Sequence, residues 1–314
     1  MSKSPLRIGI AGLGTVGVGV VRIVRKHAQL LEARAGRRIE IAAVSARSRD
    51  KVRGVDIAQY DWEDDPVAIA RRDDVDVVVE LMGGSDGPAK ATVEAAIAHG
   101  KHVVTANKAL LAHHGQDLAL AAEAKGVVLR FEAAVAGGIP VIKALTEGLA
   151  GNEITRVMGV MNGTCNYILT RMEATHQGYN ALFEEAHKLG YLEADPQLDV
   201  GGIDAGHKLS LLAAIAFGTK VDFDAVELEG IEQIELRDIE EAAEMGYRIK
   251  LLGVAQMTGR GLEQRMSPCL VPAASPLGQL EGGTNMVVIE GDMVQQIVLR
   301  GPGAGEGPTA SAVM

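Results

Sequence analysis

Residues 6–24, LRIGIAGLGTVGVGVVRIV, decide the fold predicted for the first half of the chain. A short apolar run precedes three glycines in G-x-G-x-x-G spacing, and valines then recur at helical intervals. In this strand–glycine–helix order, glycines allow a tight turn and let the backbone approach a pyrophosphate, while the helix start offers N–H groups to the anion. An ordinary βα turn is the alternative to a dinucleotide site. The residues predicted to contact the dinucleotide are Gly12, Gly14, Thr15, Val16 and Gly17.

Strand-like and helical runs alternate beyond this stretch, as far as about residue 135. The strand-like runs cover 38–46, 75–83, 101–107 and 126–135. The helical runs cover 64–72, 88–100 and 115–126. Such alternation is typical of a parallel sheet with helices on both faces. We therefore predict an α/β fold with a Rossmann-type, doubly wound parallel sheet.

A different pattern follows residue 137 and predicts a second, α+β domain. Residues 138–151 read as a helix, and 153–172 read as a strand, a turn at Asn162-Gly163 and a helix. Residues 286–305 read as a hairpin, so we expect a mixed or antiparallel sheet that also serves dimerisation. The predicted division is 1–136 for nucleotide binding, 137–300 for substrate and dimerisation, and 301–314 for a segment that returns to the nucleotide domain.

The composition limits which kinds of binding partner and which cellular location we expect for this protein. The 314 residues carry a formal net charge of −10, which argues against a nucleic-acid partner. The two cysteines, Cys165 and Cys269, are too few for a disulfide framework or a zinc site, which favours a cytoplasmic location. No apolar stretch has the length of a membrane helix, and the N-terminus enters a strand directly, so we expect neither a membrane span nor a signal peptide.

The end of the second predicted strand bears on the choice between NAD and NADP. An acidic residue there would bind the ribose hydroxyls of NAD, whereas this chain has Ser45, Ala46 and Arg47, with further basic residues behind. Arg47 can stack on an adenine and pair with a 2′-phosphate. We therefore predict NADP in preference to NAD. A solvated basic loop is the alternative.

Residues 200–218, VGGIDAGHKLSLLAAIAFG, form an apolar helical run that carries two opposite charges on its inner stripe. Asp204 and Lys208 lie one helical turn apart on one face. Burial makes a lysine easier to deprotonate, and a nearby carboxylate opposes that effect. Spacing alone leaves two equal interpretations: a proton carrier facing a cleft, or a structural ion pair at the start of a buried helix.

Residues 188–208, KLGYLEADPQLDVGGIDAGHK, resemble the signature of homoserine dehydrogenases, in which Asp-x-x-Gly-x-Asp-x-x-x-Lys follows an acid and a proline. Further stretches resemble other landmarks of that family in the same order: VVTANKALLA at 103–112, FEAAVAGGIP at 131–140, MNGTCNYIL at 161–169 and GPGAGEGPTASAV at 301–313. The resemblance covers essentially the whole chain. It implies the reversible, NAD(P)-dependent conversion of L-homoserine to L-aspartate 4-semialdehyde.

The resemblance also assigns roles to residues of this chain. Lys208 is implied as the general acid/base with Asp204 beside it, and Lys108 as the second active-site lysine. Glu193 and Asp204 are implied to bind the substrate ammonium, with Gly190 as a backbone contact. The turn at Gly163 and Thr164 offers further N–H groups and a hydroxyl, and Asp199 can either bind substrate or order the loop. Lys108, Gly305 and Glu306 are implied to lie near the cofactor. The resemblance further implies a monovalent cation, sodium, held by Glu132 and by the carbonyl oxygens of Val135, Gly137 and Ile139. From the residues alone, a plain strand-to-helix turn is an equal alternative.

Further expectations concern the oligomeric state of the protein and its regulation. The sheet expected in the second domain is a common dimerisation surface, so we expect a homodimer or a dimer of dimers. Many relatives continue into a regulatory ACT domain, whereas only eight residues follow Glu306 here, so we expect no separate threonine site. Two other classes are alternatives to this interpretation: an aspartate-semialdehyde dehydrogenase, which needs a cysteine nucleophile with a base, and a catalytically silent nucleotide sensor.

Overall fold

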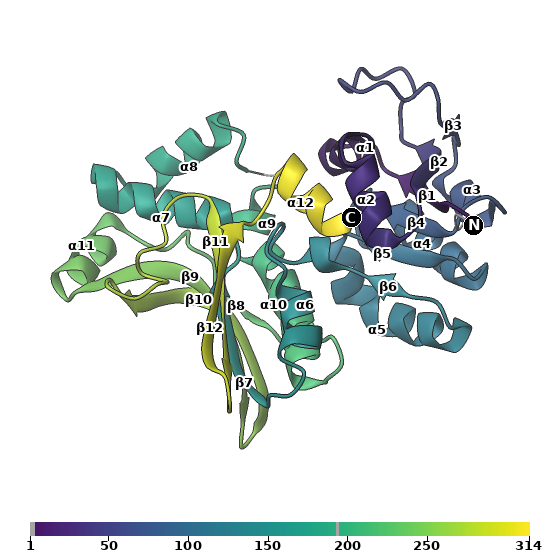
Figure 1. Cartoon of the computed structure of the whole chain (residues 1–314). Coiled ribbons are helices and arrows are strands. Elements are labelled where there is room, and N and C mark those ends of the chain that lie inside the picture. The colour runs from purple at the N-terminus through teal and green to yellow at the C-terminus, as the bar shows by residue number, and fades with distance from the viewer. Residues whose placement is uncertain (1–3, 193–194) are drawn as a thin grey trace. The chain divides into compact units, whose positions relative to one another are not determined.

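The computed structural model describes residues 4–192 and 195–314. Its internal contacts divide the chain into two compact units (Figure 1). One unit contains the chain up to Gly138 together with Ala304–Met314, and the other contains Ile139–Gly303.

The first unit is built on a six-stranded sheet with the order β3-β2-β1-β4-β5-β6. Its strands are β1 (Leu6–Ala11), β2 (Ile39–Ser45), β3 (Asp61–Trp62), β4 (Val77–Glu80), β5 (His102–Thr105) and β6 (Leu129–Arg130). Every neighbouring pair is parallel. This order is that of the Rossmann fold, so the predicted doubly wound α/β sheet is confirmed.

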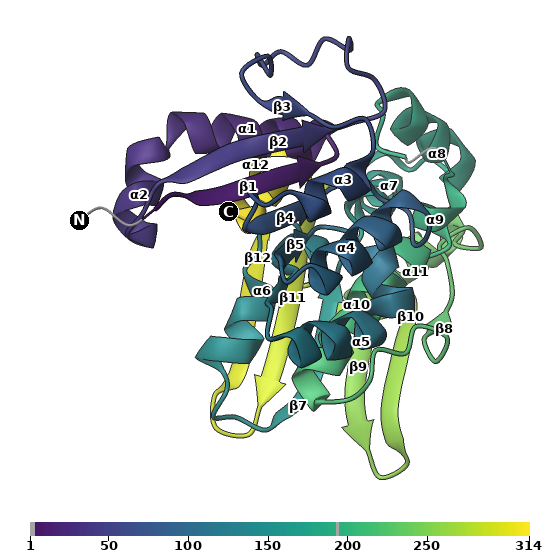
Figure 2. The same ribbon diagram turned by 90° about the vertical axis from the view of Figure 1, so that its right-hand side faces the viewer.

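Helices cover both faces of this sheet (Figure 2). They are α1 (Thr15–Lys26), α2 (Ala28–Ala35), α3 (Pro66–Arg71), α4 (Pro88–Ala98), α5 (Lys108–Lys125), the short 3-10 helix η1 (Glu132–Ala134) and α12 (Glu306–Val313). The apolar face of α1 packs with α12 against one side of the strands. Helices α3, α4 and α5 bury their alanines and aliphatic residues against the other side.

Three local features of this unit differ from the sequence pattern. Strand β3 was not expected, and it pairs with β2 over two residues only. Strand β6 is also two residues long, because the chain turns into η1 after Arg130 instead of continuing as a strand to residue 135. Helix α5 begins at Lys108, earlier than the expected run, because the Asn107 side chain accepts a hydrogen bond from the backbone N–H of Leu110 and caps the helix.

The second unit contains a six-stranded mixed sheet with the order β12-β11-β7-β9-β10-β8. Its strands are β7 (Ile154–Val160), β8 (Glu227–Leu228), β9 (Tyr247–Thr258), β10 (Gly261–Pro272), β11 (Thr284–Gly291) and β12 (Gln295–Pro302). All pairs are antiparallel except that of β10 with β8. The predicted hairpin is present, because β11 and β12 pair from Thr284 to Pro302.

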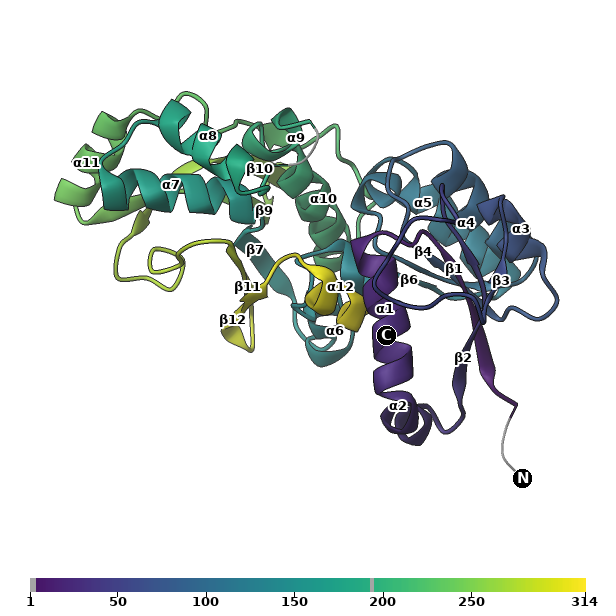
Figure 3. The same ribbon diagram turned by 90° about the horizontal axis from the view of Figure 1, so that it is seen from above.

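Helices of the second unit accompany its sheet. They are α6 (Val141–Lys143) with the π-helical turn η2 (Ala144–Gly148), α7 (Gly163–Thr175), α8 (Tyr179–Lys188), α9 (Gln197–Val200), α10 (Ile203–Phe217) and α11 (Leu236–Glu244). Helices α7, α8 and α11 are grouped together, and α10 lies apart from them (Figure 3). Residues 204–214 of α10 are all buried, as the apolar pattern predicts. Within the residues that the structure describes, no helix is long and apolar enough to cross a membrane.

A buried lysine lies in the core of this unit without any signal in the sequence. Lys250 on β9 is only 2% exposed. Its Nζ donates to the carbonyl oxygen of Leu280 at 2.5 Å and to Asn166 Oδ1 at 2.9 Å. Burial, with Arg248 as a like charge nearby, lowers the pKa of Lys250 from 10.5 to about 8, against a smaller opposing effect of Glu173 and Glu281.

This lowered pKa predicts a specific pH dependence of stability. Between pH 8 and 10.5 the unfolded chain binds more protons than the folded chain, so the free energy of unfolding rises with pH in that window. The rise is about 3 kcal/mol, since one pKa unit corresponds to about 1.4 kcal/mol. In Lys250→Met this contribution is absent. Urea unfolding of both proteins at pH 7.5 and 10 measures it, with the exposed Lys220→Met as control. A constant difference between wild type and Lys250→Met across this range would contradict the prediction.

Candidate active site

The glycine turn of the first unit has the shape that a pyrophosphate site requires. Gly12 has a φ of +110°, and a Cβ there would lie 2.6 Å from the Leu81 carbonyl oxygen. A Cβ on Gly17 would lie 2.0 Å from the Gly12 carbonyl oxygen. Gly14, by contrast, has open space where a Cβ would project, directly before the first helical residue Thr15. Two glycines therefore close the turn and the third leaves its backbone accessible to an anion.

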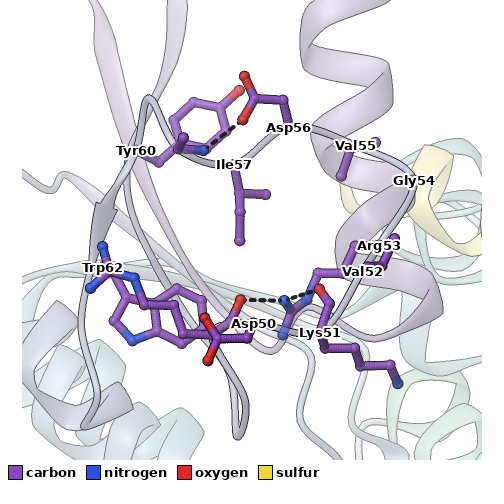
Figure 4. A pocket seen from close by; sticks show the side chains of 12 residues that line it. Asp50, Lys51, Val52, Arg53, Gly54, Val55, Asp56, Ile57, Tyr60 and Trp62 are labelled. Atoms are coloured by element: carbon purple, nitrogen blue, oxygen red, sulfur yellow. Dashed lines mark hydrogen bonds between the residues drawn. The ribbon is translucent and has the colours of Figure 1, made fainter.

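A cavity of about 540 Å³ lies in the loop that follows β2 (Figure 4). Ile57 points towards its centre, and Arg49 and Arg53 each lie 5.8 Å from the ring of Trp62. The Arg53 guanidinium donates to the Leu13 carbonyl oxygen at 3.3 Å, which ties this loop to the glycine turn. Arg47 is exposed, two residues beyond the end of β2, and does not line the cavity.

The carboxyl edge of β4 and β5 holds a chain of buried polar groups in front of Lys108. Glu80, at the end of β4, accepts hydrogen bonds from the Thr105 hydroxyl at 2.6 Å and from the backbone N–H of Met82 at 2.7 Å. The Thr105 hydroxyl accepts from the backbone N–H of Asn107, the cap of α5. Lys108 is the first residue of that helix and is half-buried. Ligands bind at this edge in open α/β sheets.

The C-terminal helix α12 belongs to the same unit and packs on α1. A Cβ on Gly19 would lie 2.8 Å from both Ala310 Cβ and the Glu306 carbonyl oxygen, so glycine permits this close approach. Gly305 precedes the helix with a φ of +115°. The Glu306 carboxylate forms a salt bridge with Arg22 on α1 at 2.5 Å.

The segment proposed for a cation contains a short helix and a left-handed turn. Glu132 begins η1, Val135 follows it, and Ala136 and Gly137 both have a φ of +54°. Ile139 is the first residue of the second unit, and its carbonyl oxygen accepts from the backbone N–H of Val141 at 2.8 Å. Among the described residues no group of three or more His, Cys, Asp or Glu has the geometry of a metal site.

In the second unit, Asp204 and Lys208 form a buried ion pair on α10. Their side chains approach to 2.6 Å between Lys208 Nζ and Asp204 Oδ2, and the residues are 9% and 6% exposed. Lys208 Nζ also donates to the carbonyl oxygen of Met161 at 2.8 Å. The prediction that both charges lie on the buried face of one helix is therefore confirmed. Their catalytic roles stay predictions.

Asn162 links this pair to a second carboxylate. The predicted turn and helix are present here, and the Asn162 side-chain oxygen caps α7 by accepting from the backbone N–H of Cys165. Its Nδ2 donates to Asp199 Oδ1 at 2.9 Å and lies 3.5 Å from Asp204 Oδ2. One amide therefore orients two buried carboxylates next to Lys208.

The thiol in this cluster is protonated. Burial is the main cause that raises the pKa of Cys165, followed by the nearby carboxylates of Asp199 and Asp204. Its Sγ donates to the Asp199 carbonyl oxygen at 3.2 Å. Cys165 is thus a packing residue rather than a nucleophile.

The remaining predicted substrate residues lie around the start of α7. A Cβ on Gly163 would lie 2.6 Å from the Gly283 carbonyl oxygen, so the helix start touches the loop before β11. The Thr164 hydroxyl donates to the Tyr191 carbonyl oxygen at 2.9 Å, directly after Gly190, which has a φ of +73°. Glu193 lies outside the described residues.

The structure places further polar groups at these two sites that no sequence motif singles out. They are the Met161 carbonyl oxygen, Glu80, Thr105, Arg53 and Asn285, whose Nδ2 donates to Met161 at 3.1 Å. Only Arg53 had a local signal, as one of several basic residues after β2. The arrangement as a whole offers an anion-binding turn in one unit and a desolvated amine with fixed acceptors in the other. An amine of that kind is suited to proton transfer.

Comparisons with known proteins agree with this chemistry. Residues 12–132 match the NAD-binding domain model of homoserine dehydrogenase, and residues 140–314 match the homoserine dehydrogenase family model. The chain is 48% identical over 310 residues to the homoserine dehydrogenase of Neisseria gonorrhoeae, an alignment that covers 99% of this chain and 71% of the relative.

Solved structures give the same result. A homoserine dehydrogenase from Thiobacillus denitrificans matches with a TM-score of 0.97 and 44% identity, over 100% of this chain and 72% of that protein. A hyperthermophilic archaeal homoserine dehydrogenase in complex with NADPH matches with a TM-score of 0.82 and 26% identity, over 98% of this chain and 95% of that protein. The chain therefore belongs to the homoserine dehydrogenase family of NAD(P)-dependent oxidoreductases that act on a CH–OH group.

Proposed function

We propose that this chain interconverts L-homoserine and L-aspartate 4-semialdehyde, with Lys208 as the general acid/base and with NADP preferred over NAD. The observation that carries this proposal is the buried Asp204–Lys208 pair, whose amine has two fixed acceptors. The nicotinamide, when bound, supplies or accepts the hydride at the terminal carbon of the substrate. The protein has to hold the substrate and move one proton at its oxygen.

The two hydrogen bonds of the Lys208 amine determine where in space its lone pair points. An uncharged amine has two N–H groups and one lone pair. When the two N–H groups are directed to Asp204 Oδ2 and the Met161 oxygen, the lone pair occupies the one tetrahedral direction of the nitrogen that is left. In oxidation the substrate hydroxyl gives its proton to this lone pair as the hydride leaves carbon. In reduction the ammonium form returns the proton to the aldehyde oxygen.

Other residues take supporting roles in the proposal. Glu193 and Asp204 bind the substrate ammonium, Asp199 orders the site through Asn162, and Gly190, Gly163 and Thr164 supply backbone and hydroxyl contacts. Lys108 is the second active-site lysine and lies at the cofactor edge, and its place at the start of α5 supports this role. Gly305 and Glu306 complete the cofactor site.

The cation and the assembly also remain proposals. Sodium is held by Glu132 and by the carbonyl oxygens of Val135, Gly137 and Ile139, an oxygen-only set that suits a hard cation. The first unit serves as the nucleotide domain and the second as the substrate domain. The second sheet forms the contact of a homodimer or dimer of dimers, which is supported by exposed apolar residues on its strands, namely Met257, Leu270 and Val298. A cytoplasmic location is part of the same proposal.

The first test concerns the glycine turn. Gly14→Ala is expected to fold normally, because a Cβ there meets no atom within 4 Å, yet to occupy the space that the pyrophosphate needs. The Kd for NADPH should rise by about tenfold or more, which corresponds to about 1.4 kcal/mol. Gly12→Ala is the matched contrast, because its strained φ and the nearby Leu81 oxygen should lower the melting temperature. Unchanged NADPH binding by Gly14→Ala in calorimetry would count against the site.

The second test concerns the reaction and its acid/base residue. The wild-type protein should form NADPH from NADP only when homoserine is added, which also separates it from a silent nucleotide sensor. Lys208→Ala should lower turnover by about 10²- to 10⁴-fold, the usual scale of general acid–base catalysis, with little change in cofactor affinity. Turnover close to that of the wild type would show that another group carries the proton.

The third test concerns cofactor choice. Arg47→Ala should weaken binding of NADPH more than that of NADH, by about 1.5–3 kcal/mol for one lost charged hydrogen bond. Arg71→Ala removes an exposed arginine at the end of α3 and serves as a charge-matched control. Equal losses for the two cofactors would mean that Arg47 stacks on the adenine or stabilises its loop without reading the 2′-phosphate.

A further inference from the structure

The carbonyl oxygen of Met161 accepts hydrogen bonds from two side chains of the second unit. Lys208 Nζ donates to it at 2.8 Å and Asn285 Nδ2 at 3.1 Å. The sheet register explains this meeting, because Val160 at the end of β7 pairs with Met286 on β11. The residues next to that pair, Met161 and Asn285, are therefore neighbours, although they lie 124 positions apart in sequence.

The side chain of Asn285 is confined in its position. The residue is 2% exposed, in the second position of β11. The backbone of Gly303 lies against its amide, and a Cβ on Gly303 would come within 2.0 Å of Asn285 Nδ2. A buried amide in such a restricted space has few alternative rotamers, so its N–H group holds a fixed direction.

We propose that Asn285 is a positioning residue that holds the Met161 carbonyl oxygen in place and thereby directs the amine of Lys208 towards the substrate oxygen. The proposal rests on the role of Lys208 proposed above. Asn285 itself touches neither substrate nor cofactor in this mechanism. It fixes one of the two acceptors that together determine where the lone pair of the uncharged amine points.

The charged groups near Lys208 allow a test of the proposal through the pH dependence of homoserine oxidation. The described titratable groups around the amine are Asp204 on α10, Asp199 on α9 and the protonated thiol of Cys165 on α7. Asn285 adds a neutral amide to this set. A carboxylate at position 285 would favour the ammonium form of Lys208, and homoserine oxidation, which needs the uncharged amine, would then require a higher pH.

A second buried amide in the same sheet provides a matched control. Gln264 on β10 is 6% exposed, and its Nε2 donates to a backbone carbonyl oxygen, that of Asp222, at 3.3 Å. This hydrogen bond goes to the segment before β8 and not to the Met161 turn. Replacement of Gln264 therefore reproduces the general cost of losing a buried amide without affecting the support of Lys208.

The experiment compares Asn285→Leu and Asn285→Asp with Gln264→Leu and Gln264→Glu in kcat and KM across pH, in both reaction directions. Asn285→Leu should lower kcat about 10-fold or more while KM for homoserine changes by less than about threefold, a loss of alignment rather than of binding. Asn285→Asp should move half-maximal homoserine oxidation to higher pH by about one unit. The Gln264 variants should show neither effect.

Several outcomes would overturn the proposal. These are a kcat of Asn285→Leu within twofold of the wild type, an unchanged pH profile of Asn285→Asp, or equal effects in the Gln264 variants. If Asn285→Leu does not fold, the profile of the isosteric Asn285→Asp decides. The variant Lys208→Ala separates the two proposals. If it retains turnover, the proposed function fails. If it is inactive, and the Asn285 variants have the same kcat and pH profile as the Gln264 variants, this inference alone is rejected.

Discussion

The burial of one charge pair at the start of α10 constrains the segments around it in the second unit. Removing two charges from water costs several kcal/mol for each ion unless they are paired and hydrogen-bonded, and loss of one partner is more harmful than loss of both. Lys208 therefore needs Asp204 and the Met161 oxygen together. The turn after β7, the start of α7, α9 and β11 each contribute one group to this network, among them Asn162 and Asn285.

Both units use the ends of their strands in a similar way. In the first unit β1 ends in the glycine turn, and β4 and β5 end in Glu80 and Thr105, whose hydrogen bond fixes the chain that leads into α5. In the second unit β7 ends at the Met161–Asn162 turn. The end of a strand is held in place by its sheet, but its polar groups no longer form hydrogen bonds with the neighbouring strands. It can therefore offer these groups to other partners in a fixed position.

Local patterns made part of this structure predictable. The glycine spacing indicated the first βα turn, the alternation of runs indicated the parallel sheet, and the four-residue spacing placed Asp204 and Lys208 on one buried face. The partners of Lys250 and Asn285 were not predictable, because each binds groups on segments 30 to 124 residues away. Such contacts depend on sheet register, which no local pattern specifies. Strand β3, with two residues, is too short to give a periodic signal.

The position of Cys165 shows how the environment restricts the chemistry of this cluster. A thiolate beside an acid/base pair would offer a covalent route of the kind that an aldehyde-oxidising enzyme uses. Here burial, and to a smaller extent the surrounding carboxylates, raise the pKa of the Cys165 thiol, and its S–H is directed to a backbone oxygen. The same carboxylate, Asp204, holds the amine of Lys208. Burial therefore keeps the sulfur protonated, with help from the same carboxylate that orients the nitrogen of Lys208, and this arrangement supports the proton transfer proposed for that lysine.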